Sequence, residues 1–385
     1  MANFIRTFGE MSRDDFQLAG GKAANLGELT QAGFNVPPGF CVTSTALPYV
    51  IEANGLQPQI DALAQGLDPE DMGNFDDRTA RIRDLINTAD IPADLLGEIR
   101  QAITNLCAGD DPFVAVRSSV AVKDSRVSSF PGMMDTYHYL RGQAEILEHI
   151  QRCWASLWTS RAATTRHYKS IEHDRGLIVS IVQRMVHSEI AGVLFTANPI
   201  NASREEMILE ANWGLGESVV SGKSMNDYFV LTRNPLAVKE RKIVRKSPIV
   251  VFDQERGRGR KEIEPEPHQS EAPTLSDDQL LDLGGRHQQR PDPVQTLLVL
   301  VRDRGEGRFH VDVRRPGHTG RRGEARLAAG CDPVTRHPSL APLRLSPRDL
   351  RSGRGLGDYG DVPGPAGAEA TVGEGGHGFM EADRA

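Results

Sequence analysis

The sequence has no excess of basic residues, no paired cysteines and no long apolar run, and each absence excludes a class of protein. Its 385 residues carry 45 Lys and Arg against 52 Asp and Glu, so no basic surface for nucleic acid is expected. The four cysteines form no CxxC pair, which argues against a zinc knuckle and a disulfide framework. No stretch approaches the roughly 18 apolar residues of a membrane span, and the N-terminus lacks a signal-peptide pattern. We therefore expect a cytoplasmic protein without a nucleic-acid or membrane partner.

The composition changes towards the end of the chain. From residue 264 onward there is no Lys, Ile or Asn, whereas Arg, Gly, Ala and Pro become frequent. A disordered linker, a basic interaction tail and a GC-rich gene translated out of frame would each give such a segment. Loss of every residue type with AT-rich codons fits the out-of-frame interpretation better, because a natural disordered tail usually keeps some Lys. Since TLSDDQLLDLG (274–284) is typical of a capped helix, we predict an irregular tail over 285–385, either disordered or frame-shifted.

Residues 1–284 alternate helical and extended patterns, which predicts an α+β protein. Residues 45–107 are mostly amphipathic helix, and in the helices of 143–171 we expect Trp154 and Trp158 to pack in the core. Short extended runs predict a mostly antiparallel sheet in the second half. These runs are 177–186, 191–199, 205–214, 227–233 and 237–245.

Lys22 is a candidate phosphate ligand. It follows Gly20 and Gly21 and stands at the start of a predicted helix that ends at Gly33. Glycines let backbone N–H groups approach a ligand, and a helix N-terminus favours an anion. The alternative is a surface lysine after a turn, and the Walker A pattern is absent from the chain.

Arg117 is the second candidate. It lies in PFVAVRSS (112–119), where a predicted buried strand leads into a polar loop. A guanidinium beside two hydroxyls suits phosphate oxygens, because charge-assisted hydrogen bonds are strong. The alternative is an arginine paired with a carboxylate, for which Asp124 and Asp135 are the available partners.

Three further features could contribute to a nucleotide site. The segment SFPGMMDT (129–136) has a glycine for close approach and apolar residues to exclude water, although an ordinary surface turn would look the same. Gln183 lies in the middle of an apolar strand, where its amide could meet an adenine edge or simply bond to neighbouring backbone. Glu210 and Glu217 could help to hold a metal, or they could be solvated or paired within the structure.

Five segments occur in an order that resembles one family. They are GGKAANLGELTQAGFNVPPGF, VAVRSS, SFPGMMDTY, VQRMVHSEIAGVLFTANP and ANWGLGESVVSG. Together they resemble the N-terminal ATP-binding domain of the dikinases, a group that includes phosphoenolpyruvate synthase, pyruvate phosphate dikinase and rifampicin phosphotransferase. The resemblance covers about residues 10–284.

The resemblance implies an ATP-grasp fold, in which two α+β lobes clamp ATP. The first lobe would span 1–187, and an incomplete second lobe would span 188–284, followed by the tail of 285–385.

It also implies the role of each site residue. Lys22 and Arg117 would bind phosphates and act in catalysis, Gly132 and Thr136 would belong to a loop over the nucleotide, and Gln183 would lie near the adenine. The ligands implied are ATP and Mg²⁺.

Enzymes that this chain resembles split ATP to AMP and pass a phosphoryl group to a histidine on a swivelling domain. Two parts of that machinery cannot be found. FHVDVRRP (309–316) resembles the strand that carries a QxRP-like motif in the family, but it has no glutamine, and no T-x-H segment follows. Lys123 also stands where relatives usually have an acidic residue.

We therefore expect a kinase-type nucleotide-binding domain that cannot complete the reaction alone, with a separate chain as partner for the phosphohistidine and acceptor steps. The alternatives are the same domain from a rifampicin phosphotransferase and a non-catalytic ATP-binding remnant.

Overall fold

The structure is a computed structural model of the chain. It describes residues 4–122, 135–201, 203–220, 224–288, 297–303 and 308–314, with backbone only for residues 220, 297–300, 302 and 312–314.

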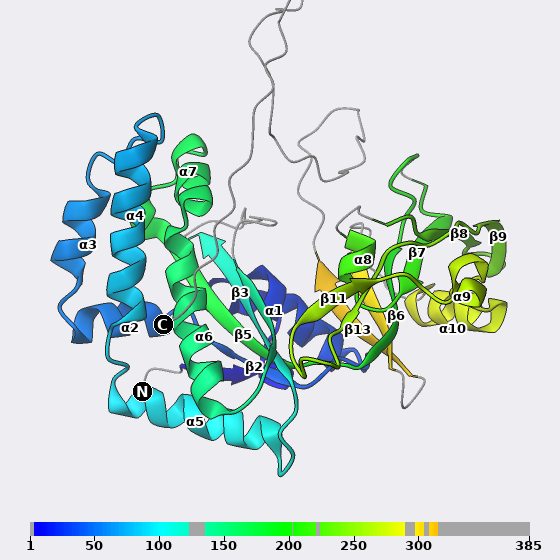
Figure 1. The fold of residues 1–385 in the computed structure, drawn as a ribbon, viewed down its shortest axis with the longest axis horizontal. Coiled ribbons are helices and arrows are strands. Elements are labelled where there is room, and N and C mark those ends of the chain that lie inside the picture. The colour runs from blue at the N-terminus through cyan, green and yellow to red at the C-terminus, as the bar shows by residue number, and fades with distance from the viewer. Residues whose placement is uncertain are drawn as a thin grey trace, which may run out of the picture. The chain divides into compact units, whose positions relative to one another are not determined.

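The first sheet has five antiparallel strands in the order β1-β2-β5-β3-β4 (Figure 1). The strands are β1 Ile5–Thr7, β2 Gly39–Val42, β3 Val114–Val122, β4 Thr136–Leu140 and β5 Gly176–Arg184. The central strands β3 and β5 are rich in β-branched residues and are buried along most of their length, so both faces of this sheet are covered.

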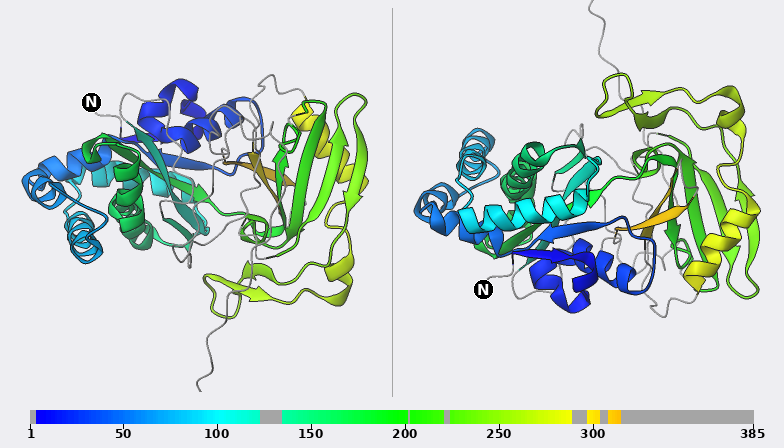
Figure 2. Two further views of the ribbon diagram at one scale, coloured as in Figure 1. Left: turned by 90° about the horizontal axis from the view of Figure 1, so that it is seen from above. Right: turned by 90° about the horizontal axis from the view of Figure 1, so that it is seen from below.

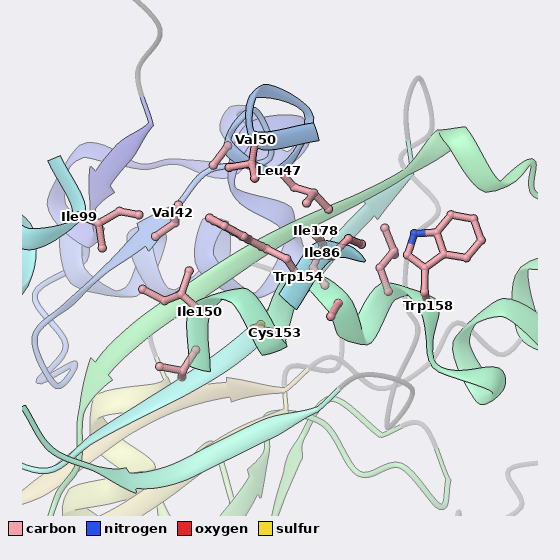
Figure 3. Packing of buried hydrophobic residues seen from close by; sticks show 14 of the residues in the cluster. Val42, Leu47, Val50, Ile86, Ile99, Ile150, Cys153, Trp154, Trp158 and Ile178 are labelled. Carbon is pink, nitrogen blue, oxygen red and sulfur yellow. The ribbon is translucent and has the colours of Figure 1, made fainter. Parts of the chain in front are cut away.

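Six helices lie on one side of the first sheet and share one apolar core with it. They are α2 Ala46–Ala53, α3 Gln57–Ala64, α4 Met72–Asn87, α5 Ala93–Cys107, α6 Gln143–Ala155 and α7 Ser160–Tyr168. Alternate residues of the strands, such as Val42 and Ile178, meet the apolar sides of these helices in one core (Figure 3). Trp154 is fully buried and Trp158 is 5% exposed, which confirms the prediction that both pack in the core. Short 3-10 turns complete this part: η1 Phe8–Glu10, η2 Arg13–Asp15, η3 Ser156–Trp158 and η4 His173–Arg175.

The other face of the first sheet is covered by α1 (Phe16–Gln31). Its buried residues Ala23 and Leu26 pack in a second core with Cys41 and Ile181, which point away from the first core. This second core continues into the second sheet, where it includes Leu209. The face that carries α1 is therefore also the face on which the two sheets share apolar contacts.

The second sheet has six antiparallel strands in the order β13-β12-β6-β7-β8-β9. The strands are β6 Ser188–Phe195, β7 Glu206–Trp213, β8 Asp227–Thr232, β9 Ala237–Lys242, β12 Leu297–Asp303 and β13 Phe309–Arg314. A separate two-stranded ribbon and three helices accompany it: β10 Ile249–Phe252, β11 Arg260–Ile263, α8 Glu217–Val220, α9 Pro267–Glu271 and α10 Asp277–Gln288. Helix α10 lies along this sheet (Figure 2). Leu280 and Leu283 of α10 are fully buried there.

The prediction of an irregular tail from residue 285 is wrong for three segments. Residues 285–288 continue α10, and residues 297–303 and 309–314 form β12 and β13, which extend the second sheet beyond β6. The second sheet is thus larger than expected, and Asn35 bonds to its β13 edge. The backbone N–H of Val311 donates to the carbonyl oxygen of Asn35 (3.0 Å), and the Asn35 side chain donates to the carbonyl oxygen of Phe309 (3.2 Å).

Mixed helices and antiparallel sheets confirm the α+β class. The chain passes from the first sheet to the second between Arg184 and Ser188, close to the expected lobe boundary, while the division into lobes at 187 remains a prediction. Among the residues that the structure describes, no helix combines the length and apolarity that crossing a membrane requires.

Candidate nucleotide site

Helix α1 is broken at Gly20, and this break places Lys22. Gly20 has φ 68° and ψ 166°, a backbone conformation that residues other than glycine rarely adopt. A Cβ atom on Gly20 would lie 2.4 Å from the Ser119 hydroxyl oxygen. The same hydroxyl accepts a hydrogen bond from the backbone N–H of Lys22 at 3.0 Å. A glycine is therefore required for the start of the regular part of α1 to approach β3 this closely.

The Lys22 side chain is directed to β3. Its Nζ donates to the carbonyl oxygen of Ser118 at 2.7 Å, and the residue is half-buried. The ammonium thus lies near the N-terminal end of the regular part of α1, where backbone N–H groups add positive potential. This arrangement matches the prediction of a lysine at a helix start, and differs from an exposed lysine after a turn.

Arg117 and Gln183 form one buried pair. Nη1 of Arg117 donates to Oε1 of Gln183 at 3.1 Å, and Nε2 of Gln183 donates to the carbonyl oxygen of Pro37 at 3.1 Å. The two residues are 9% and 5% exposed. Gln183 therefore does bond to neighbouring backbone, which was one of the two interpretations of this amide. The structure thus joins Arg117 and Gln183, two of the predicted site residues, by a direct hydrogen bond.

Strand β3 is longer than the sequence suggested. It runs to Val122, so Arg117, Ser118 and Ser119 lie inside a strand and are buried rather than standing at the entrance to a loop. The extension follows from pairing with β5, which continues along the whole strand to Gly176. Pairing of this kind depends on a distant segment and cannot be read from the local polar residues.

Thr136 lies beside Arg117 in the first sheet. It is the first residue of β4, is exposed, and pairs with Arg117 in the register of β3 and β4. Gly132 lies outside the described residues, as do Lys123 and Asp124, so their predicted roles have no structural account.

Asp135 contacts Arg161 and Tyr137 through its carboxylate. Its carboxylate lies 3.8 Å from Nη2 of Arg161 on α7 and 3.2 Å from the hydroxyl oxygen of Tyr137, whereas we had considered it as a partner for Arg117. Its backbone carbonyl oxygen accepts from the Ser118 hydroxyl at 3.3 Å. We missed Arg161 as a residue of this region, and it lies in the helices predicted over 143–171.

The charges of this region act on a buried thiol nearby. Burial raises the pKa of Cys153 to about 12; a hydrogen bond with Ser180 and the Lys22 ammonium oppose the rise, and the Asp135 carboxylate adds to it. Both charges therefore lie within electrostatic reach of the same atom.

The two candidate metal ligands are already engaged. Glu217 forms an ion pair with Arg260 at 2.5 Å, and the Glu210 carboxylate accepts from the Asn226 side chain at 3.3 Å. Across the described ranges, no group of three or more His, Cys, Asp or Glu side chains is arranged to hold a metal ion. The described residues therefore do not offer a preformed magnesium site, and the interpretation of these glutamates as structurally paired is favoured.

A cavity of about 290 Å³ lies at the end of β5, next to Gln183. Its lining includes Phe113, Tyr139 and Met185 together with Arg141 and Arg184. Arg141 lies over the ring of Phe113, 4.0 Å from its centroid. The lining also includes Asp110 and Asp111, which form ion pairs with Arg184 (2.6 Å) and Arg141 (3.6 Å). The cavity thus combines apolar walls with a few charged groups, a lining that is typical of small-molecule sites.

Comparison with known proteins gives the class of this chain. The family described as "Pyruvate phosphate dikinase, AMP/ATP-binding domain" matches residues 16–291. The match covers most of the chain, so the chain belongs to this family, as its five sequence segments had indicated.

Individual relatives of the chain have the names of phosphoenolpyruvate synthases and of a rifampicin phosphotransferase. A probable phosphoenolpyruvate synthase of Pyrococcus abyssi is 33% identical over 358 residues, which cover 81% of this chain and 43% of the relative. A probable phosphoenolpyruvate synthase of Staphylothermus marinus is 41% identical over 260 residues, covering 66% of this chain and 31% of the relative. A rifampicin phosphotransferase of Bacillus cereus is 35% identical over 285 residues, covering 74% and 32%.

These alignments also bear on the extent of the domain. The chain spans less than half the length of each of these relatives. The Pyrococcus abyssi alignment covers more of this chain than residues 1–291 alone provide, so it continues into the region of β12 and β13. The two strands that extend the second sheet therefore lie within a segment that this relative shares.

Proposed function

We propose that this chain binds ATP between its two sheets in the manner of an ATP-grasp domain. The observation that carries the proposal is that Lys22 donates to the carbonyl oxygen of Ser118, the residue next to Arg117 in β3, while Arg117 is bonded to Gln183 of β5. The lobes would be residues 1–187 and a second lobe that begins at residue 188. The second lobe would extend past residue 284, because β12 and β13 belong to its sheet.

The proposed phosphate site has the chemistry that a polyphosphate requires. Lys22 provides a point charge close to helix N–H groups, and Arg117 provides a planar donor fork held by a buried amide. Ser119 and Thr136 add hydroxyls at the same end of the sheet. Preorganised cations lower the cost of bringing several negative charges together, so we assign the triphosphate to this end.

The adenine would lie towards the other end of β5. Gln183 keeps one amide hydrogen and one carbonyl lone pair beyond the two hydrogen bonds given above, which is enough for a base edge. The cavity lined by Phe113 and Met185 begins at the next residue and supplies the apolar surface that a purine ring prefers. Gly132 would contribute a backbone approach to the phosphates, as the family resemblance implies.

Mg²⁺ is proposed to arrive on the nucleotide. The described residues form no metal cluster, and Mg²⁺ is commonly bound through substrate phosphates with only one or two carboxylates.

The reaction of the whole enzyme would be ATP cleavage to AMP with transfer of a phosphoryl group to a histidine on another domain. Relatives named phosphoenolpyruvate synthase support this reaction class. The present residues supply nucleotide binding and charge neutralisation, while the histidine-bearing and acceptor domains would come from elsewhere, for example a separate chain. We therefore propose that this chain binds ATP but does not by itself complete the transfer.

Titration calorimetry with MgATP tests the proposal. A single site with clear preference for ATP over adenosine is expected, because Lys22 and Arg117 act on phosphates. MgATP should also protect residues 120–140 from limited proteolysis. Absence of both heat and protection at millimolar MgATP would contradict ATP binding.

A rifampicin phosphotransferase domain is the second candidate, favoured by the 35% identity to the Bacillus cereus enzyme. The nucleotide site would be the same and only the phosphoryl acceptor would differ. A mixture with a phosphohistidine domain from either enzyme class would separate the two, since only the matched domain should become labelled from radioactive ATP. Binding of ATP without any labelling would favour the third candidate, a non-catalytic ATP-binding remnant.

A further inference from the structure

Arg161 lies beside the proposed phosphate site, on helix α7. The proposed function assigns no role to this helix. Helix α7 packs on the helical side of the first sheet, and Nη2 of Arg161 lies 3.8 Å from Oδ1 of Asp135. The side chains of Arg161 and Asp135 are 56% and 40% exposed. An ion pair with this distance and exposure is weak, because water screens the two charges.

A chain of contacts joins this pair to Lys22. The Ser118 carbonyl oxygen accepts from Nζ of Lys22 at 2.7 Å, and the Ser118 hydroxyl donates to the carbonyl oxygen of Asp135 at 3.3 Å. Asp135 directly precedes Thr136, which is paired with Arg117. Arg161 is thus linked to Lys22 through Asp135 and Ser118. It is linked to Arg117 through Asp135 and the neighbouring Thr136.

We propose that Arg161 is a third phosphate-binding cation, which Asp135 holds beside the site until the nucleotide displaces it. This inference rests on the proposed ATP binding and adds to it a residue and an exchange. The triphosphate carries more negative charge than the Asp135 carboxylate and offers a bidentate geometry to the guanidinium. Arg161 exchanges one anionic partner for a stronger one, so Asp135 acts as a competitor for the phosphates.

The competition predicts different effects on MgATP affinity for substitutions of Arg161 and of Asp135. Arg161→Gln removes the cation and should weaken MgATP binding about tenfold, the factor expected when one charge-assisted contact is lost. Asp135→Asn keeps the size of the side chain and its hydrogen-bond acceptor for Tyr137 but removes the competing charge. It should therefore leave MgATP binding unchanged or strengthen it. Affinity for adenosine should be the same in all variants.

The experiment is calorimetric titration of the full chain and its variants with MgATP, MgADP and adenosine. Arg81→Gln is the matched control, because Arg81 forms a similarly exposed ion pair with Asp77 at 3.9 Å on α4. The proposal predicts weaker ATP binding for Arg161→Gln alone.

Two results would overturn it. One is ATP binding by Arg161→Gln that equals that of Arg81→Gln. The other is equal weakening by Arg161→Gln and Asp135→Asn, which would indicate that the ion pair only fixes the local structure. Failure of the unmodified chain to bind ATP would instead refute the proposed function, so the two failures are distinguishable.

Discussion

Replacement of Gly20 by alanine tests how the chain places Lys22. Gly20 combines φ 68° with ψ 166°, and holding alanine in such a conformation costs on the order of 1–3 kcal/mol. The added Cβ would also lie 2.4 Å from the Ser119 hydroxyl oxygen and 3.1 Å from its backbone carbon. Forcing an atom into a packed site costs about 1–3 kcal/mol more. The free energy of unfolding should therefore fall by about 2–6 kcal/mol.

Gly21→Ala is the matched control. Gly21 lies in the helical part of α1, and a Cβ there would first meet the edge of the Phe16 ring at 3.1 Å, a side chain that can shift. Alanine is favoured over glycine inside helices by up to about 1 kcal/mol, so this variant should be neutral or slightly more stable.

Urea unfolding followed by circular dichroism gives both values from one experiment. A Gly20→Ala variant as stable as the unmodified chain would refute the account of the bend. Equal damage from Gly20→Ala and Gly21→Ala would refute it as well, because the two sites differ only in backbone conformation and in what their Cβ atoms meet.

Three further predictions concern buried groups. Asp227→Asn leaves the fully buried Lys246 without the carboxylate that lies 2.9 Å from its Nζ, and should cost about 3–5 kcal/mol in urea unfolding, part of which the double variant with Lys246→Met should recover. Burial, with the Arg166 charge second, lowers the pKa of His173 to about 4 from 6.5, so this group stabilises the fold above pH 6.5 and loses that effect as the pH falls towards 4. The difference in stability between the unmodified chain and His173→Gln should shrink over that range, and a difference independent of pH would contradict the assignment. Burial raises the pKa of Cys153 to about 12, so mass spectrometry should find this thiol unreactive towards alkylation at pH 8 until urea unfolds the chain.

Much of the fold follows from local patterns. The extended runs predicted over 191–199, 205–214, 227–233 and 237–245 correspond to β6, β7, β8 and β9, because each is a short extended run between turn signals. The helix start at Lys22 was predicted from two glycines, and the structure shows that Gly20 is needed there for both its φ angle and its contact with Ser119.

Strand β12 was missed for a physical reason, whereas β13 lies in FHVDVRRP (309–316), which was noted only as resembling a strand of the family. Overall composition, rich in Arg and Gly and free of Lys and Ile, suggested an irregular chain from residue 285. Strand formation depends instead on a short apolar stretch that can pair, and LLVLVRD (297–303) is such a stretch beside β6. A bias in average composition does not remove a local pattern of this kind.

Contacts between distant elements limited the prediction of the site. The order of the motifs identified Lys22, Arg117 and Gln183, and two of these turned out to be hydrogen-bonded to each other. The pairing of Asp135 with Arg161 could not be predicted, because it depends on how α7 packs in the core of the first sheet.

The most direct test of the central claim is the affinity of the unmodified chain for MgATP beside Lys22→Gln and Arg117→Gln. The account predicts one site in the unmodified chain and at least about tenfold weaker binding in each variant, because each loses a charge-assisted contact to phosphate. Arg241→Gln, which breaks an exposed ion pair with Asp277 in the second sheet, should bind as the unmodified chain does. Undiminished binding in both Lys22→Gln and Arg117→Gln would contradict the claim that these residues hold the phosphates.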